Sequence, residues 1–71
     1  MEFNEKIKKL RKELKLTQQQ VADSIEIRYQ KYQLLEYGKN KPSFDTLAKL
    51  CICLNVSADY LLGISEIKER R

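Results

Sequence analysis

Apolar residues recur along the first part of this chain with the spacing of an amphipathic helix. Phe3, Ile7, Leu10 and Leu14 follow one another at intervals of three or four residues, so they share one helical face. Charged side chains occupy most of the other positions, with glutamate early and lysine late, which matches the helix dipole. The pattern predicts a helix over residues 3–14 that packs its apolar face into a core.

A second, shorter helix is predicted to begin after Thr17. Threonine is a good N-cap, and Gln20 stands where a capping box has Glu or Gln. Val21, Ala22 and Ile25 then provide the inner face of this helix. We expect it to end near residue 24.

A third helix fits residues 28–36. Tyr32 and Leu35 lie three residues apart on one face, which we expect to pack on the second helix. The opposite face carries long polar side chains, namely Arg28, Tyr29, Gln30 and Gln33. Glutamine amides can read base edges, and arginine can read guanine or bind phosphate. Two short helices with a tight joint, the second with exposed amides, describe a DNA-binding helix-turn-helix.

A fourth helix follows a short basic loop. Gly38 is a helix stop, residues 39–42 form the loop, and Ser43 can cap the next helix. The predicted inner face of that helix consists of Phe44, Leu47, Ala48, Leu50, Cys51 and Leu54.

The chain ends in a fifth, very short helix and an appendix. Asn55 ends the fourth helix because asparagine tolerates the left-handed conformation. Ser57 caps a helix over residues 58–62, and Gly63 ends it. Residues 64–71 are expected either to form another helical turn or to fray.

Several short motifs and their joint spacing resemble the Cro/phage-repressor type of helix-turn-helix domain. These motifs are Leu16-Thr17-Gln18, Val21-Ala22, Leu35-Glu36, Gly38-Lys39, Lys41-Pro42-Ser43, Leu47, Leu50 and residues 55–63. The resemblance covers roughly residues 3–63. It implies an all-α fold, a compact five-helix lambda-repressor-like domain over residues 1–63. Most members of this family are sequence-specific transcriptional regulators that bind DNA as dimers.

Two positions depart from the family pattern. Glu26 stands in the joint where the family commonly has glycine, and a non-glycine residue in a left-handed conformation costs ~1–2 kcal/mol. Either Glu26 accepts that strain or the joint differs slightly. Arg28 stands where the family often has Ser or Thr as a cap, so the third helix is expected to begin without a side-chain cap.

The resemblance implies two sets of DNA contacts. The residues expected to enter the major groove are Tyr29, Gln30, Gln33 and Leu34. The residues expected to contact the sugar-phosphate backbone are Thr17, Gln18, Arg28, Lys31, Tyr37, Lys39, Asn40 and Lys41. The alternative is an ordinary exposed helix surface beside a solvated polar turn. Tyr32 and Leu35 are expected in the core, and Glu36 is expected to support the structure.

A self-association surface is predicted near the chain end. It consists of Ile52, Cys53, Tyr60, Ile64 and Ile67. The alternative is a set of scattered exposed apolar residues, which are common. We expect a homodimer because one such domain covers a single half-site.

The net charge and length of the chain limit the classes of partner that it is expected to bind. The chain has 71 residues and a formal net charge of +4, which suits one small domain with a polyanionic partner such as double-stranded DNA. The basic residues of the first helix are Lys6, Lys8, Lys9, Arg11, Lys12 and Lys15. They form either a solvated face or a phosphate-facing flank. Binding to a membrane surface ranks low because the apolar stripe is needed for the core.

Other partners and chemistries find little support. No stretch approaches the ~20 apolar residues that span a bilayer, and no signal peptide is visible, so we expect a cytoplasmic protein. Cys51 and Cys53 would point to different faces of one helix and could not readily bridge. With no histidine, a zinc site within one chain is not expected. No cofactor, small-molecule ligand or catalytic constellation is indicated.

Two functions of different classes follow. The first is a sequence-specific DNA-binding transcriptional regulator, a repressor or a small control protein at a partly palindromic site. The second is a protein-interaction module with the same fold, such as an antitoxin-like partner or co-regulator, which Glu26, Leu34 and Ile52 fit better.

Overall fold

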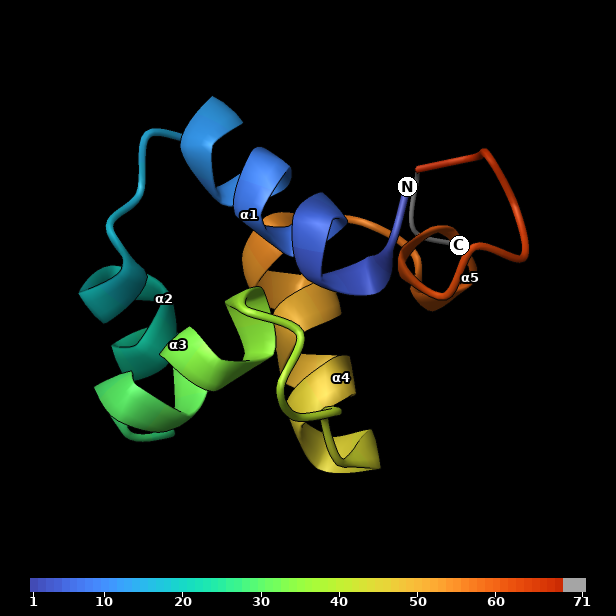
Figure 1. Cartoon of the computed structure of the whole chain (residues 1–71). Coiled ribbons are helices and arrows are strands. Elements are labelled where there is room, and N and C mark those ends of the chain that lie inside the picture. Colours follow the sequence, from blue (N-terminus) through green and yellow to red (C-terminus); the bar gives the residue numbers. More distant parts are fainter. Residues whose placement is uncertain (69–71) are drawn as a thin grey trace.

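The computed structural model describes residues 1–68, and within them it contains α-helices and no strand (Figure 1). The five helices of this part are α1 (Phe3–Glu13), α2 (Gln18–Ser24), α3 (Tyr29–Glu36), α4 (Phe44–Leu54) and α5 (Ala58–Leu61). The predicted all-α fold of five helices is confirmed for this part of the chain.

Three of the helices begin at the predicted side-chain caps. The Thr17 hydroxyl accepts a hydrogen bond from the backbone N–H of Gln20. The side-chain Oε1 of Gln20 accepts one from the backbone N–H of Thr17 at 2.8 Å, which completes a capping box. Ser43 accepts from the N–H of Thr46, and Ser57 accepts from that of Tyr60. Each bond satisfies a backbone donor that the helix itself leaves unpaired.

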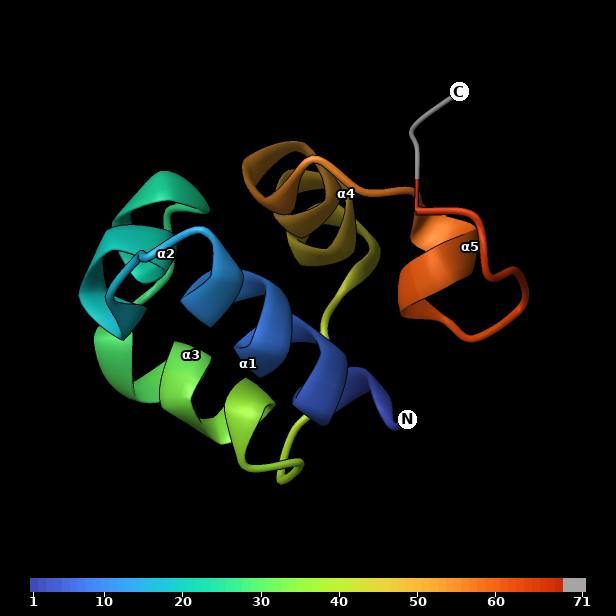
Figure 2. The same ribbon diagram turned by 90° about the horizontal axis from the view of Figure 1, so that it is seen from above.

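The packing places α2 and α3 at one end of the domain and α5 at the other (Figures 1 and 2). α2 packs mainly on α3. α1 contacts α3, α4 and α5, and so it joins the α2–α3 pair to the rest of the domain. Side chains from all five helices and the loops meet in one core of buried hydrophobic residues, namely Ile7, Leu10, Val21, Ala22, Ile25, Tyr32, Leu35, Leu50, Cys51, Leu54, Val56 and Leu61. This core holds α3 with its opposite side toward solvent.

Three residues predicted for inner faces lie outside the core. Leu14 is 48% exposed because α1 ends at Glu13 and Leu14 is already its C-cap. Phe44 is 94% exposed and Ala48 is also exposed. The buried residues of α4 are Thr46, Leu50, Cys51 and Leu54, and Phe44 is the first residue of this helix.

The segment after α5 is neither a helical turn nor detached. Residues 64–68 are irregular, and they fold back so that Ser57 bonds them twice. Its N–H donates to the carbonyl oxygen of Lys68 at 2.7 Å, and its hydroxyl donates to that of Ile67 at 2.9 Å. The rest of the predicted appendix, residues 69–71, lies outside the described residues.

Candidate nucleic-acid interface

The joint between α2 and α3 is made by a residue in the left-handed conformation. Glu26 has φ 61°, which is the left-handed conformation. Of the two outcomes expected from the sequence, the strained Glu26 is therefore the one observed. The N–H of the next residue, Ile27, donates back to the carbonyl oxygen of Ala22 at 3.0 Å and closes the end of α2. Arg28 is the N-cap of α3 and makes no side-chain cap hydrogen bond, as predicted.

The surface of α3 divides into three zones. Tyr32, Leu35 and Glu36 are buried against the other helices. The side chains of Gln30, Lys31 and Leu34 face solvent. Tyr29 and Gln33 are half-buried between these zones. The four residues predicted to enter the major groove therefore do share the open side of one helix, but two of them also contact the protein.

A buried ion pair fixes α3 to α1. The Nε of Arg11 donates to Oε2 of Glu36 at 2.6 Å and its Nη2 donates to Oε1 at 3.2 Å, while Nη1 donates to the carbonyl oxygen of Leu16 at 2.8 Å. The side chain of Glu36 is 1% exposed and that of Arg11 is 11% exposed. The prediction that Glu36 supports the structure is confirmed.

The protonation state of Glu36 follows from its partners. Burial by itself raises the pKa of this carboxyl group, but the hydrogen bonds from Arg11 and Gln18, together with the charge of Arg11, outweigh burial and hold the pKa below its ordinary value. The same pairing raises the pKa of Arg11. The pair is therefore ionised at neutral pH.

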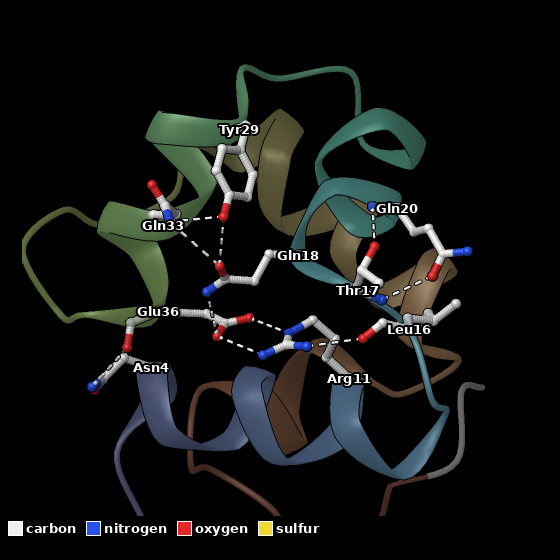
Figure 3. A network of polar contacts seen from close by, with 9 residues as sticks. All are labelled: Asn4, Arg11, Leu16, Thr17, Gln18, Gln20, Tyr29, Gln33 and Glu36. Atoms are coloured by element: carbon white, nitrogen blue, oxygen red, sulfur yellow. Dashed lines mark hydrogen bonds and ion pairs between the residues drawn. The ribbon is translucent and has the colours of Figure 1, made fainter.

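Gln18 connects this ion pair to the exposed side of α3 (Figure 3). Its Nε2 donates to Oε1 of Glu36 at 3.1 Å. Its Oε1 accepts from the hydroxyl of Tyr29 at 3.3 Å and from Nε2 of Gln33 at 3.5 Å. Gln33 also donates to the Tyr29 hydroxyl at 3.0 Å. Gln18, for which we predict a phosphate contact, therefore also bonds within the protein, and its sequence position gave no sign of this.

Tyr32 lies beside the ion pair in the core. It is fully buried, and its hydroxyl makes no hydrogen bond within the part of the chain that the structure describes. Burial raises the pKa of Tyr32 well above its ordinary value, and the charge of Glu36 acts in the same direction. The prediction that Tyr32 is a core residue is confirmed.

Positive charge flanks the open side of α3. Lys39, Asn40 and Lys41 are all exposed in the loop that follows α3, next to Tyr37, which is 61% exposed. Arg28 and Lys31 are exposed on α3 and its cap. Thr17 is exposed at the start of α2. The structure thus leaves the predicted backbone-contacting residues accessible, apart from the half-buried Gln18.

Two of the basic residues of α1 are not part of a solvated face. Arg11 is committed to Glu36, and Lys6 donates from Nζ to the carbonyl oxygen of Tyr60 at 2.7 Å. The same Nζ lies 4.7 Å from the centroid of the Tyr60 ring, a cation–π contact that joins α1 to α5. Sequence spacing gave no signal for these pairs, because their members lie far apart in the chain.

The residues of the predicted self-association surface lie on α4, on α5 and after it. Ile52 is 66% exposed, Ile64 is 74% exposed and Ile67 is 48% exposed. Cys53 and Tyr60 are half-buried and pack partly against the core. Exposed apolar side chains are therefore present where the sequence analysis expected them.

Other site types have little basis in the described residues. Residues 1–68 contain no group of three or more His, Cys, Asp or Glu side chains that could hold a metal ion. Within the same range, every helix is too short or too polar to cross a membrane.

Comparison with known proteins shows which family has this arrangement of helices. A family model described as "Helix-turn-helix" matches residues 7–61, which include α2, the joint and α3. The chain belongs to the helix-turn-helix family. The resemblance to the Cro/phage-repressor type is thereby confirmed.

Relatives and solved structures agree with this assignment. The chain is 45% identical over 60 residues to the uncharacterized HTH-type transcriptional regulator YqaE of Bacillus subtilis (strain 168), a match that covers 84% of this chain and 52% of YqaE. The chain spans about half the length of the curated relatives it matches. These relatives are therefore longer than the domain described above.

Two solved structures share the helical arrangement. The P22 c2 repressor, solved in complex with a synthetic operator, matches with a TM-score of 0.86 and 26% identity, covering 92% of this chain and 98% of the repressor chain. The complex of the SinR and SinI proteins contains a chain that matches with a TM-score of 0.80 and 26% identity, covering 84% of this chain and 59% of that chain.

Proposed function

We propose that this chain is a sequence-specific DNA-binding transcriptional regulator that inserts α3 into the major groove. One observation carries the proposal: the whole domain superposes in fold on the P22 c2 repressor, which was solved with a synthetic operator, and the side of α3 facing away from the core carries exposed amide and basic side chains. We place this activity in the cytoplasm. It is a binding function and needs no cofactor or catalytic group.

The base contacts come from the open side of α3. Gln30 is exposed and can pair with adenine through both ends of its amide. Leu34, 38% exposed, offers an apolar contact to a thymine methyl group. Tyr29 and Gln33 reach the same groove from their half-buried positions.

The backbone contacts surround α3 on both sides. They come from the start of α2, from the first turn of α3 and from the loop after it, through Thr17, Gln18, Arg28, Lys31, Tyr37, Lys39, Asn40 and Lys41. Such contacts position the protein and make binding depend on salt, but they carry no sequence information.

A homodimer extends recognition to a partly palindromic site. The surface we assign to it consists of Ile52, Cys53, Tyr60, Ile64 and Ile67. A two-fold dimer places its reading helices roughly 34–36 Å apart, one turn of DNA. A repressor or small control protein fits this arrangement.

A salt series tests DNA binding itself. Fluorescence anisotropy with a random duplex should show affinity that falls steeply as salt rises, since bound lysine and arginine residues release counterions. Lys39→Ala should weaken binding to all duplexes alike and reduce the salt slope by about one. Lys8→Ala, which removes an exposed charge from α1, is the matched control and should leave the slope closer to that of the wild type. No binding at low salt would contradict the proposal.

One observation favours a second candidate function. The SinR–SinI structure is a complex of two proteins, and this chain exposes Ile52 and Leu34. A protein-interaction module, such as an antitoxin-like partner or co-regulator, would use these side chains. A stable heterologous complex together with failure to bind DNA at low salt would establish this alternative.

A further inference from the structure

A network of hydrogen bonds joins Glu36, Gln18, Tyr29 and Gln33. Which group donates and which accepts at each bond is fixed, because Glu36, at one end of the network, is a carboxylate. An ionised carboxylate can only accept hydrogen bonds. Arg11 occupies one side of Glu36, and the Gln18 amide meets Oε1 at 3.1 Å. Only the Nε2 end of Gln18 can make that bond, so its Oε1 must point away from Glu36, toward α3 (Figure 3).

The direction is passed on to the exposed side of α3. The outward Oε1 of Gln18 accepts from the Tyr29 hydroxyl at 3.3 Å. A phenol has one hydrogen to donate, so the same hydroxyl can meet Gln33 only as an acceptor. Gln33 accordingly donates from Nε2 to Tyr29 at 3.0 Å and to Gln18 at 3.5 Å. Both acceptors of the Gln33 Nε2 group belong to the protein, so the Nε2 end of this amide faces the protein.

We propose that Tyr29 and Gln18 orient Gln33 so that the Oε1 end of its amide faces DNA, which makes Gln33 select a base with a major-groove amino group. Those bases are cytosine, through N4, and adenine, through N6. Guanine and thymine present acceptors at the corresponding edge and are disfavoured. This inference rests on the proposed DNA-binding function and names the specificity of one position.

Gln30 provides an internal contrast. Its side chain is exposed, and within residues 1–68 its amide makes no hydrogen bond. It can turn either end toward a base, so its preference is set by DNA alone. Gln33 differs because the protein has already chosen which end faces outward. Tyr29 is therefore a positioning residue for Gln33.

The test uses operator duplexes from a selection on the wild-type protein. Gln33→Ala identifies the base pair that depends on Gln33, and competition with four duplexes then compares the bases at that pair. The wild type should prefer C or A on the contacted strand by roughly three- to tenfold, the ratio that one net hydrogen bond supplies. A Gln33-dependent preference for G or T would overturn the inference.

Two variants test the role of the network. Tyr29→Phe keeps the ring but removes the hydroxyl, so Gln33 can rotate and the preference should fall toward equality. Gln33→Glu, whose carboxylate only accepts, should keep the C or A preference while lowering overall affinity through repulsion from phosphates. An unchanged preference in Tyr29→Phe, or a lost preference in Gln33→Glu, would overturn the inference.

Controls separate this inference from the proposed function. Gln19→Ala removes an exposed amide of α2 that bonds Asp23 and lies outside the network, and base preference should not change. If Tyr29 only contacted a phosphate, Tyr29→Phe would lower the affinity for all four duplexes equally and leave the base preference unchanged. If the wild type enriches no motif at all, the proposed function fails. If it enriches a motif in which the Gln33-dependent base is G or T, only the present inference fails.

Discussion

Glu36 of α3 accepts hydrogen bonds from Arg11 of α1 and Gln18 of α2, and so it connects three helices. It is buried, it is ionised, and it holds Arg11 and Gln18 in one arrangement. Removing one partner of a buried ion pair strands the other charge away from water, which destabilises the fold far more than loss of a surface pair.

Arg11→Met is expected to lower the free energy of unfolding by ~3–5 kcal/mol, because it leaves the Glu36 carboxylate buried without its partner. Denaturant unfolding measures this loss. Lys12→Met, at an exposed position of the same helix, is the control and should change stability by no more than about 0.5 kcal/mol. The double variant Arg11→Met/Glu36→Gln should regain part of the loss. A loss below about 1 kcal/mol in Arg11→Met would show that the pair is not energetically coupled to the fold.

The pH dependence has a definite sign. Because the folded pKa of Glu36 lies below the ordinary value of 4.5, its contribution to stability is fully present above that value and is lost as pH falls through the folded pKa. Carboxyl NMR titration should place the Glu36 pKa below 4.5 in the wild type. In Arg11→Met burial then dominates, and the pKa should rise. A wild-type pKa above the ordinary value would contradict the description of the ion pair.

At the scale of elements, all five helices of the described part end in the same way. The residue just past each helix, or at its cap, has positive φ: Lys15, Glu26, Gly38, Asn55 and Gly63. In each case the N–H of the following residue bonds back to a carbonyl in the last turn or just before it. Two of the five are glycines, and the other three ends use Lys15, Glu26 and Asn55, which adopt this conformation less readily than glycine does.

Replacing Glu26 with glycine should relieve this strain. Glu26→Gly is expected to raise the free energy of unfolding by about 0.5–1 kcal/mol, since the left-handed penalty of ~1–2 kcal/mol is removed and part of it is offset by the greater freedom of glycine in the unfolded chain. Thermal and denaturant unfolding measure the change.

Lys15→Gly is the matched comparison for that variant. Lys15 has φ 59°, close to the 61° of Glu26, whereas Glu26 also pairs with Lys49 at 3.1 Å on an exposed surface. Lys15→Gly should stabilise at least as much as Glu26→Gly, because it loses no ion pair. Destabilisation by both variants would contradict the view that these ends are strained.

The sequence predicted the elements better than the contacts between them. Local signals, namely the Thr17 capping box, the Ser43 cap and the tolerance of Asn55 for positive φ, set helix ends within a few residues of chain. The Arg11–Glu36 pair, 25 residues apart, and the Lys6–Tyr60 contact, 54 residues apart, depend on the tertiary fold and left no local pattern. The candidate DNA contacts came from family resemblance, but no spacing argument could show that Gln33 is tied to Gln18. The four-residue spacing of Tyr29 and Gln33 on one helix was the one local hint of that network.

At the scale of the whole molecule, α3 and the segment after α5, which carries Ile64 and Ile67, occupy different parts of the domain. α3 lies with α2 at one end, and α5 with the segment that carries Ile64 lies at the other (Figures 1 and 2). DNA reading and self-association can therefore use separate surfaces, as a dimer on two half-sites requires.

Ile52→Glu is expected to weaken the proposed homodimer about tenfold or more, because a charge would replace an apolar contact at the interface. Sedimentation equilibrium measures the dimer dissociation constant. Phe44→Glu is the control: Phe44 is 94% exposed on the same helix but lies outside the proposed surface, so the constant should stay unchanged. A larger effect of Phe44→Glu than of Ile52→Glu would move the interface to the start of α4.

Selection of bound sequences from a random duplex pool, run in parallel on the wild type and on Gln30→Ala, tests the central proposal most directly. The wild type should enrich a two-fold motif with half-sites separated by about one helical turn. Gln30→Ala should lose ~1–3 kcal/mol of discrimination at one base pair of each half-site and keep the rest of the motif. If no motif is enriched, or if Gln30→Ala selects the same motif with the same affinity, α3 is not the reading helix and the proposal is wrong.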